Sequence, residues 1–236
     1  MTTYKTYLNG YLVFFFGMML NQSVVMSDLN VSLADIFLVV MFIYMVIRQF
    51  SLKIPLKEMS FFIFLSIMLI IVPFVAIPLF LNIDVPDEDI IKGYIKYIVV
   101  FLYFLCGYNM HTGDTTKKFL IGFVTGSVVV SFLSILATIT NFKPLMALFY
   151  PDNTRLQGFM NDPNYFAIIQ LIAFGIVVKL QMKPKYKVIF AIPILISIIL
   201  SGSKTGLIST TLVIIVMFIS KIRSAKNYKS ISWIIA

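Results

Sequence analysis

The chain has 236 residues, of which 60% are hydrophobic and 12% are charged, and its net charge is +9. A soluble domain carries about twice that charged fraction, so the composition excludes an ordinary soluble domain. Long apolar runs instead predict an all-α, polytopic integral membrane bundle. The positive charge does not require nucleic acid, because lysines on cytoplasmic loops explain it.

Cysteine and histidine usage excludes two further classes of protein. The chain has one cysteine, Cys106, and one histidine, His111. A disulfide framework and a Cys/His zinc site both need more such residues. The acidic segment 84–89 lacks the spacing of a calcium loop, so a solvated loop is favoured over a metal site. We therefore expect no metal.

Apolar segments of about 20 residues are the length that crosses a bilayer. Eight such segments are predicted as spans, at 7–26, 32–50, 60–81, 93–109, 118–140, 164–181, 188–203 and 205–220. The first has no cleavage site and is expected to be retained. Residues 231–236 predict the opening of a ninth span, so we expect this chain to be part of a longer protein.

The distribution of basic residues predicts the orientation of these spans. With the N-terminus in the cytoplasm, 14 of the 19 lysines and arginines fall on inside segments. This bias is the one that sets membrane topology. It places the segments 141–164 and 201–206 on the outer face.

Local signals support helices in the predicted spans. Ser32 and Asp35 have the spacing of a capping box at the start of the second span. Pro73 and Pro78 are expected to kink the third span, and Pro193 the seventh.

Small residues form a stripe along the fifth span. It consists of Gly122, Gly126, Ser127, Ser131, Ser134 and Thr138. Small residues at this spacing let helices approach closely, so we favour packing over the alternative of a substrate groove.

The first of two polar breaks in the apolar pattern covers residues 155–165. A short amphipathic helix on the outer membrane surface is predicted just before it. Asp162 followed by Pro163 is a typical helix start, with the aspartate as the cap. That explanation leaves Arg155, Gly158 and Asn164 without a structural role, and arginine binds oxyanions through a planar fork.

The second polar break covers residues 201–206. It does not match a phosphate-binding P-loop, and Ser201 with Lys204 gives only the weak three-letter spacing of Ser–Lys hydrolases. Two interpretations stay open. The segment is either a tight turn or an anion site that combines Lys204 with the free backbone N–H groups near Thr205 and Gly206. We expect the helices between the two breaks to bring them together.

The two breaks taken together resemble the bacterial O-antigen ligase and polysaccharide polymerase family. Arg155-x-x-Gly158 is followed by Asn161-x-Pro163-Asn164, and then by a Ser-Gly-Ser-Lys-Thr-Gly element at 201–206. The family more often has arginine at the position of Lys204. The resemblance is carried by residues 150–220, so we predict helices in 1–149 and the first part of a ligase-like domain in 150–236.

This resemblance implies an all-helical membrane glycosyltransferase of the bacterial cytoplasmic membrane, acting in surface, capsular or O-antigen polysaccharide synthesis. Its donor would be an undecaprenyl-diphosphate-linked glycan, with no nucleotide sugar, metal or other cofactor, and its partners would include other polysaccharide-assembly membrane proteins. Arg155 is the candidate catalytic residue, stabilising the departing diphosphate. The candidate substrate-binding residues are Lys204, Gly158, Asn161, Asn164, Ser201, Ser203 and Thr205. Asp162 is favoured as a cap over a base.

Two rival functions remain open. A flippase for lipid-linked glycans would place charged residues deep in its helices, whereas the charges of this chain lie almost entirely at predicted helix ends. A non-catalytic membrane subunit is the other alternative. The family continues through further spans and a large outside loop, so we expect this chain by itself to be inactive.

Overall fold

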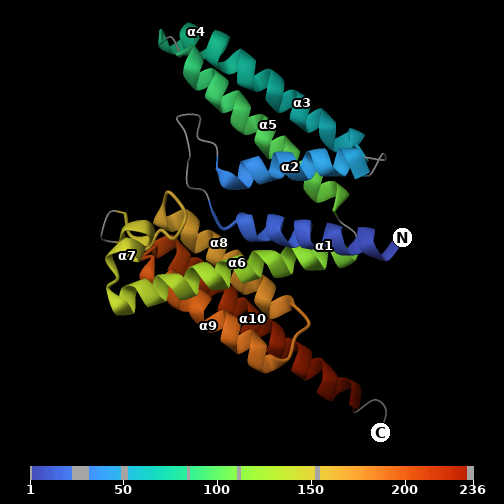
Figure 1. Cartoon of the computed structure of the whole chain (residues 1–236), viewed down its shortest axis with the longest axis vertical. Helices are drawn as coiled ribbons and strands as arrows, with labels where there is room; N and C mark the ends of the chain where they lie inside the picture. Colours follow the sequence, from blue (N-terminus) through green and yellow to red (C-terminus); the bar gives the residue numbers. More distant parts are fainter. Residues whose placement is uncertain are drawn as a thin grey trace. The chain divides into compact units, whose positions relative to one another are not determined.

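The computed structural model describes residues 2–22, 32–48, 53–83, 86–110, 113–151 and 155–232. In these ranges the regular elements are helices, so the predicted all-α class is confirmed (Figure 1). His111 and Asp84 lie outside the described residues. Contacts divide the chain into two compact units, Met1–Phe123 and Val124–Ala236. The predicted boundary between 149 and 150 rests on the family resemblance and stays a prediction.

The first unit contains helices that match the first four predicted spans. They are α1 (Thr2–Met19), α2 (Leu33–Arg48), α3 (Leu56–Ile71), the π-helical turn η1 (Val72–Ala76), α4 (Ile77–Leu81) and α5 (Asp87–Asn109). Buried side chains of α1, α2 and α5 form its core around Phe16, Leu38 and Cys106. These residues belong to three separate apolar segments, which pack because each buries part of its surface on the other two.

The prolines of the third predicted span interrupt its regularity as expected. Pro73 lies in the π-helical turn that separates α3 from α4. A proline nitrogen cannot donate to a carbonyl of the preceding turn, and a wider turn accommodates the gap. The helix ends at Asn82, whose φ of 50° is left-handed.

The predicted capping box at the start of α2 is confirmed. The backbone N–H of Ser32 donates to Asp35 Oδ2 at 2.9 Å, and the N–H of Asp35 donates to Ser32 Oγ at 3.2 Å. The second oxygen of Asp35 accepts a bond from the Tyr103 hydroxyl at 3.1 Å. The cap therefore also ties α2 to α5.

Glycines allow α1 and the first turns of α6 (Gly113–Thr140) to touch through their backbones. A Cβ on Gly122 would overlap the carbonyl oxygen of Phe14, and a Cβ on Gly17 would overlap that of Phe119. The packing interpretation is confirmed at Gly122, because only a residue without a side chain fits there.

The second unit contains the rest of α6, with α7 (Lys143–Phe149), α8 (Pro163–Lys179), α9 (Pro184–Leu200) and α10 (Lys204–Ser232). Helices α8, α9 and α10 contact one another and lie side by side in Figure 1. Its core centres on Phe149, Leu156 and Phe166, which are almost completely buried. The short helix predicted before the first polar break is present as α7.

Three described helices are long and apolar enough to cross a membrane, namely Leu56–Leu81, Asp87–Asn109 and Asp114–Thr140. The remaining apolar helices in the described ranges are shorter, so the structure supports membrane-spanning helices without establishing eight spans. The predicted ninth span lies mostly outside the described residues and stays a prediction. Ile231 and Ser232 are the last residues of α10, which continues because no glycine or proline follows Gly206 to break it; residues 233–236 lie outside the described ranges.

Candidate functional site

The two polar breaks meet in the second unit. Arg155 Nε donates a hydrogen bond to the backbone oxygen of Ser201 at 2.9 Å, and Arg155 Nη2 donates to Asn164 Oδ1 at 3.4 Å. The Ser203 hydroxyl donates to the same Asn164 oxygen at 2.8 Å. The start of α8, the turn before α10 and Arg155 thus share one small hydrogen-bonded cluster.

The first break begins α8 in the way that its sequence predicts. Asp162 is the N-cap, and its Oδ1 accepts bonds from the backbone N–H groups of Asn164 at 2.6 Å and Tyr165 at 3.2 Å. Pro163 occupies the first turn, where its missing N–H costs nothing. The expected capping role of Asp162 is confirmed, and its carboxylate is held by the helix end.

Gly158 is required by the backbone and by a close contact. Its φ is +59°, and a Cβ at this position would lie 2.5 Å from the Phe166 ring. Residues with a side chain rarely adopt this conformation. Gly158 therefore lets the loop fold tightly over the first turn of α8.

The second break is a tight turn with its own internal bonds. Gly202 has a φ of +59°, and the backbone N–H of Ser203 donates to Ser201 Oγ at 3.2 Å. Ser203 then acts as the cap of α10, because its Oγ accepts the N–H of Gly206 at 3.0 Å. The tight-turn interpretation is confirmed.

The prediction of a free amide at Gly206 is wrong. The Ser203 side chain takes this N–H, as a cap residue normally does. Gly206 has instead a packing role, since a Cβ there would lie 2.5 Å from the Cβ of Ala167. The close approach of α10 to α8 depends on it.

The view that Arg155, Gly158 and Asn164 have no structural role is also wrong. Arg155 satisfies a carbonyl at the C-terminal end of α9, where a positive charge is favourable. The amide oxygen of Asn164 joins Arg155 to Ser203. Each residue positions part of the junction, and this contribution could not be seen without the neighbouring helices.

Arg155 nevertheless keeps most of its hydrogen-bonding capacity. A guanidinium has five N–H donors, and two of those of Arg155 have partners among the described residues. The side chain is only partly buried, and no carboxylate of the described chain pairs with it. Three donors can therefore donate hydrogen bonds to an anion without breaking the junction.

The other candidate residues differ in exposure. Asn161, Lys204 and Thr205 are exposed, while Ser201 and Ser203 are buried. The Ser201 hydroxyl donates to the Ile198 carbonyl, and the Ser203 hydroxyl donates to Asn164. In the described ranges Lys204 has no acidic partner. The substrate-binding roles of these residues stay predictions.

A buried polar cluster between α6, α8 and α9 was missed by the sequence reasoning. The Ser131 hydroxyl lies 3.1 Å from Gln170 Oε1 and 2.9 Å from Ser197 Oγ, and Ser197 Oγ donates to the Ile194 carbonyl. An amide in the middle of an apolar helix was the available signal, because polar groups there usually contact another helix.

Comparisons of the chain with protein-family models, curated proteins and solved structures found no match. The resemblance to the O-antigen ligase and polymerase family therefore rests on the residues of the two polar breaks. Its functional implications are proposals.

Proposed function

We propose that this protein functions in a membrane glycosyltransferase reaction that joins undecaprenyl-diphosphate-linked oligosaccharide units. The reaction would take place on the outer face of the bacterial cytoplasmic membrane, with the N-terminus of the chain in the cytoplasm. Two independent lines support the proposal: the motif residues of the two breaks, and the basic-residue bias that predicts both breaks outside.

The observation that carries the proposal is the hydrogen bonding of the Arg155 guanidinium. This guanidinium is fixed by Ser201 and Asn164, yet three of its N–H donors have no partner among the described residues and can bind a ligand. The Arg155 side chain packs against the Gly202 turn, because a Cβ added to Gly202 would lie 3.4 Å from Arg155 Nε. Exposed Lys204 begins the helix that follows this turn. A fixed arginine, with a lysine two residues after the turn that it contacts, suits a diphosphate better than a neutral sugar.

In the proposed reaction, a hydroxyl of the acceptor glycan attacks the anomeric carbon of the donor. A new carbon–oxygen bond forms, and the bond to the lipid diphosphate breaks. Negative charge increases on the departing diphosphate, where Arg155 and Lys204 would stabilise it. The hydroxyl proton must pass to a base, and the capping bonds of Asp162 argue against that residue.

The test separates diphosphate binding from glycan transfer. Binding of undecaprenyl diphosphate to the purified chain should weaken about 10- to 100-fold in Arg155→Ala, because bonds between charged partners are lost. Arg155→Lys should recover only part of this loss, since lysine has no planar fork. In cells, Arg155→Ala should abolish glycan transfer at an unchanged protein level in the membrane.

Lys143→Ala is the matched control. Lys143 is an exposed cation of the same unit, at the start of α7, so its removal changes net charge without touching the junction. If Lys143→Ala and Arg155→Ala weaken diphosphate binding equally, the effect of Arg155 is general charge attraction and not a specific site. Normal transfer by Arg155→Ala would remove Arg155 from the site.

A further inference from the structure

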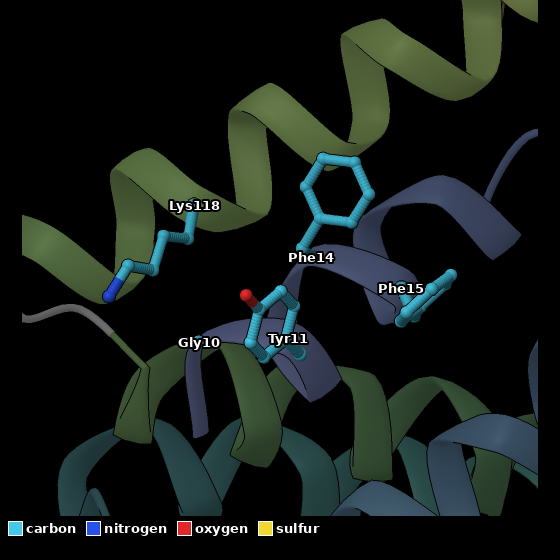
Figure 2. Close-up of a pocket in the computed structure, with 5 residues that line it drawn as sticks. All are labelled: Gly10, Tyr11, Phe14, Phe15 and Lys118. Atoms are coloured by element: carbon cyan, nitrogen blue, oxygen red, sulfur yellow. The ribbon is translucent and has the colours of Figure 1, made fainter. Parts of the chain in front are cut away.

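A groove in the first unit lies between α1 and the start of α6. It is lined by Gly10, Tyr11, Phe14, Phe15 and Lys118, and its volume is about 430 Å³. Figure 2 shows the aromatic side chains coming from α1 and the lysine from α6. The exposed fractions of Tyr11 and Phe15 are 62% and 46%, so aromatic surface in the groove is open to an occupant.

Among the described residues that line this apolar groove, Lys118 is the cation. Lys118 Nζ is 2.6 Å from Asp114 Oδ2 in a pair one helical turn apart, and the Asp114 side chain is 72% exposed. An exposed pair of this kind contributes little to stability, so an anion can compete for the ammonium group. Lys117 is also exposed, but it is not among the residues that line the groove, because adjacent residues of a helix point in different directions.

Gly10 lets the lysine lie directly against α1. A Cβ at Gly10 would lie 3.0 Å from Lys118 Nζ and 3.1 Å from its Cδ. The long side chain therefore crosses from α6 to α1 at a point where α1 has no side chain. A larger residue at Gly10 would fill this end of the groove and displace a flexible side chain, with little strain in the helices.

The position of Lys118 along α6 corresponds to a membrane surface. Residues Asp114–Thr140 are long and apolar enough to cross a membrane, and Lys118 lies in the second turn of that segment. Lysines near the ends of such helices reach toward lipid headgroups. In a membrane-spanning α6, the Lys118 end of the groove would lie at headgroup level.

We propose that this groove binds an anionic phospholipid, with the phosphate at Lys118 and an acyl chain against Tyr11, Phe14 and Phe15. A soluble anion would use the cation but not the aromatic surface, and a neutral lipid would use the surface but not the cation. Only an amphiphile with a negative headgroup matches both parts. The site lies outside the unit that carries Arg155, so it is independent of the proposed transferase function.

Native mass spectrometry of the purified chain in detergent tests the proposal. The protein is titrated with phosphatidylglycerol or with phosphatidylcholine of the same acyl chains. Phosphatidylglycerol should be retained better, and Lys118→Ala should weaken its retention about fivefold, the contribution typical of one lysine at a charged membrane surface. Gly10→Leu should weaken retention of both lipids, because it occupies the groove.

Two matched variants serve as controls. Each variant must elute as a single species on gel filtration, which shows that it is folded and not aggregated. Lys117→Ala removes the neighbouring charge, and Gly107→Leu adds the same side chain where nothing lies within 4 Å; both should retain phosphatidylglycerol nearly as the parent does. Equal retention of the two lipids, equal effects of the Lys117 and Lys118 variants, or displacement of the lipid by inorganic phosphate would overturn the proposal. If Gly10→Leu aggregates, the Lys118 and Lys117 pair decides alone.

Discussion

Ser203 connects two helix ends through a single hydroxyl group. Its oxygen accepts the backbone N–H of Gly206 and its proton goes to Asn164. Asn164 in turn accepts a bond from Arg155, so the position of the guanidinium depends on the cap of α10. At the residue scale, the candidate site is an extension of ordinary helix capping, with Arg155 as the member that has donors to spare.

Gly158→Ala tests how tightly the loop over α8 is constrained. The new Cβ would lie 2.5 Å from the Phe166 ring at a φ of +59°. We expect a loss of about 2–4 kcal/mol in the free energy of unfolding from the left-handed conformation and the overpacking. The measurement is a denaturation titration in mixed micelles.

Gly175→Ala is the control for this prediction. Gly175 lies inside α8 with nothing within 4 Å, so alanine should leave stability unchanged or raise it by up to about 1 kcal/mol. A similar loss in both variants would show that the measurement responds to any change in α8.

At the element scale, α6 makes two different kinds of contact along its length. Near its start, glycines bring its backbone against α1. Further along, Ser131 contacts Gln170 and Ser197. The two serine hydroxyls have two protons for three contacts, with Gln170, with each other and with the Ile194 carbonyl. All three contacts are hydrogen bonds only if the side-chain amide of Gln170 is turned over, so that its NH2 group donates to Ser131 Oγ. This orientation would also give a partner to the buried Nε2, which otherwise has none among the described residues.

Gly122→Ala should separate α1 from α6. The added methyl group would overlap the Phe14 carbonyl, which cannot move without the helix. We expect a loss of about 2–3 kcal/mol in the free energy of unfolding, and a similar loss for Gly17→Ala. The double variant should lose less than the two single losses combined, because the first substitution already moves the helices apart.

Gly107→Ala is the comparison for these variants, since nothing lies within 4 Å of Gly107 in α5. Its stability should match or exceed that of the parent. Fully additive losses at Gly17 and Gly122 would contradict a shared backbone contact.

At the scale of the whole molecule, helix length determines which helices can cross a bilayer. Helix α8 has 17 residues, about 25 Å at the helical rise, against a hydrocarbon core of about 30 Å. It lies at the lower limit for a span, and its apolar composition alone does not place its two ends on opposite sides. The proposed topology requires that it does.

Single cysteines test the topology. In a Cys106→Ala background, Asn161→Cys should react with a membrane-impermeant maleimide in intact cells, and Lys185→Cys only after the membrane is opened. Both positions are exposed, so access to each depends on the membrane. Labelling of both from outside would show that α8 does not cross, and the reverse pattern would invert the orientation.

The sequence predicted the features that depend on neighbouring residues. Asp162 and Pro163 define the start of α8 within a few positions, and Ser32 with Asp35 defines that of α2. Apolar runs placed most helices close to their observed bounds, because the length and continuity of such runs are local properties. The last predicted span, 205–220, agrees with the apolar part of α10, and the helix continues beyond it because charged residues such as Lys221 and Arg223 end the apolar run without breaking the helix.

The partners of Arg155 could be known only from the tertiary structure. Ser201 is 46 residues away in sequence, and Asn164 receives bonds from both Arg155 and Ser203. The sequence by itself determined that the chain is helical, apolar and interrupted by two polar segments. Only the packing of α8, α9 and α10 decided that these segments meet, because hydrogen bonds between distant segments depend on how the helices pack. The same packing decided which N–H donors of Arg155 have no partner among the described residues.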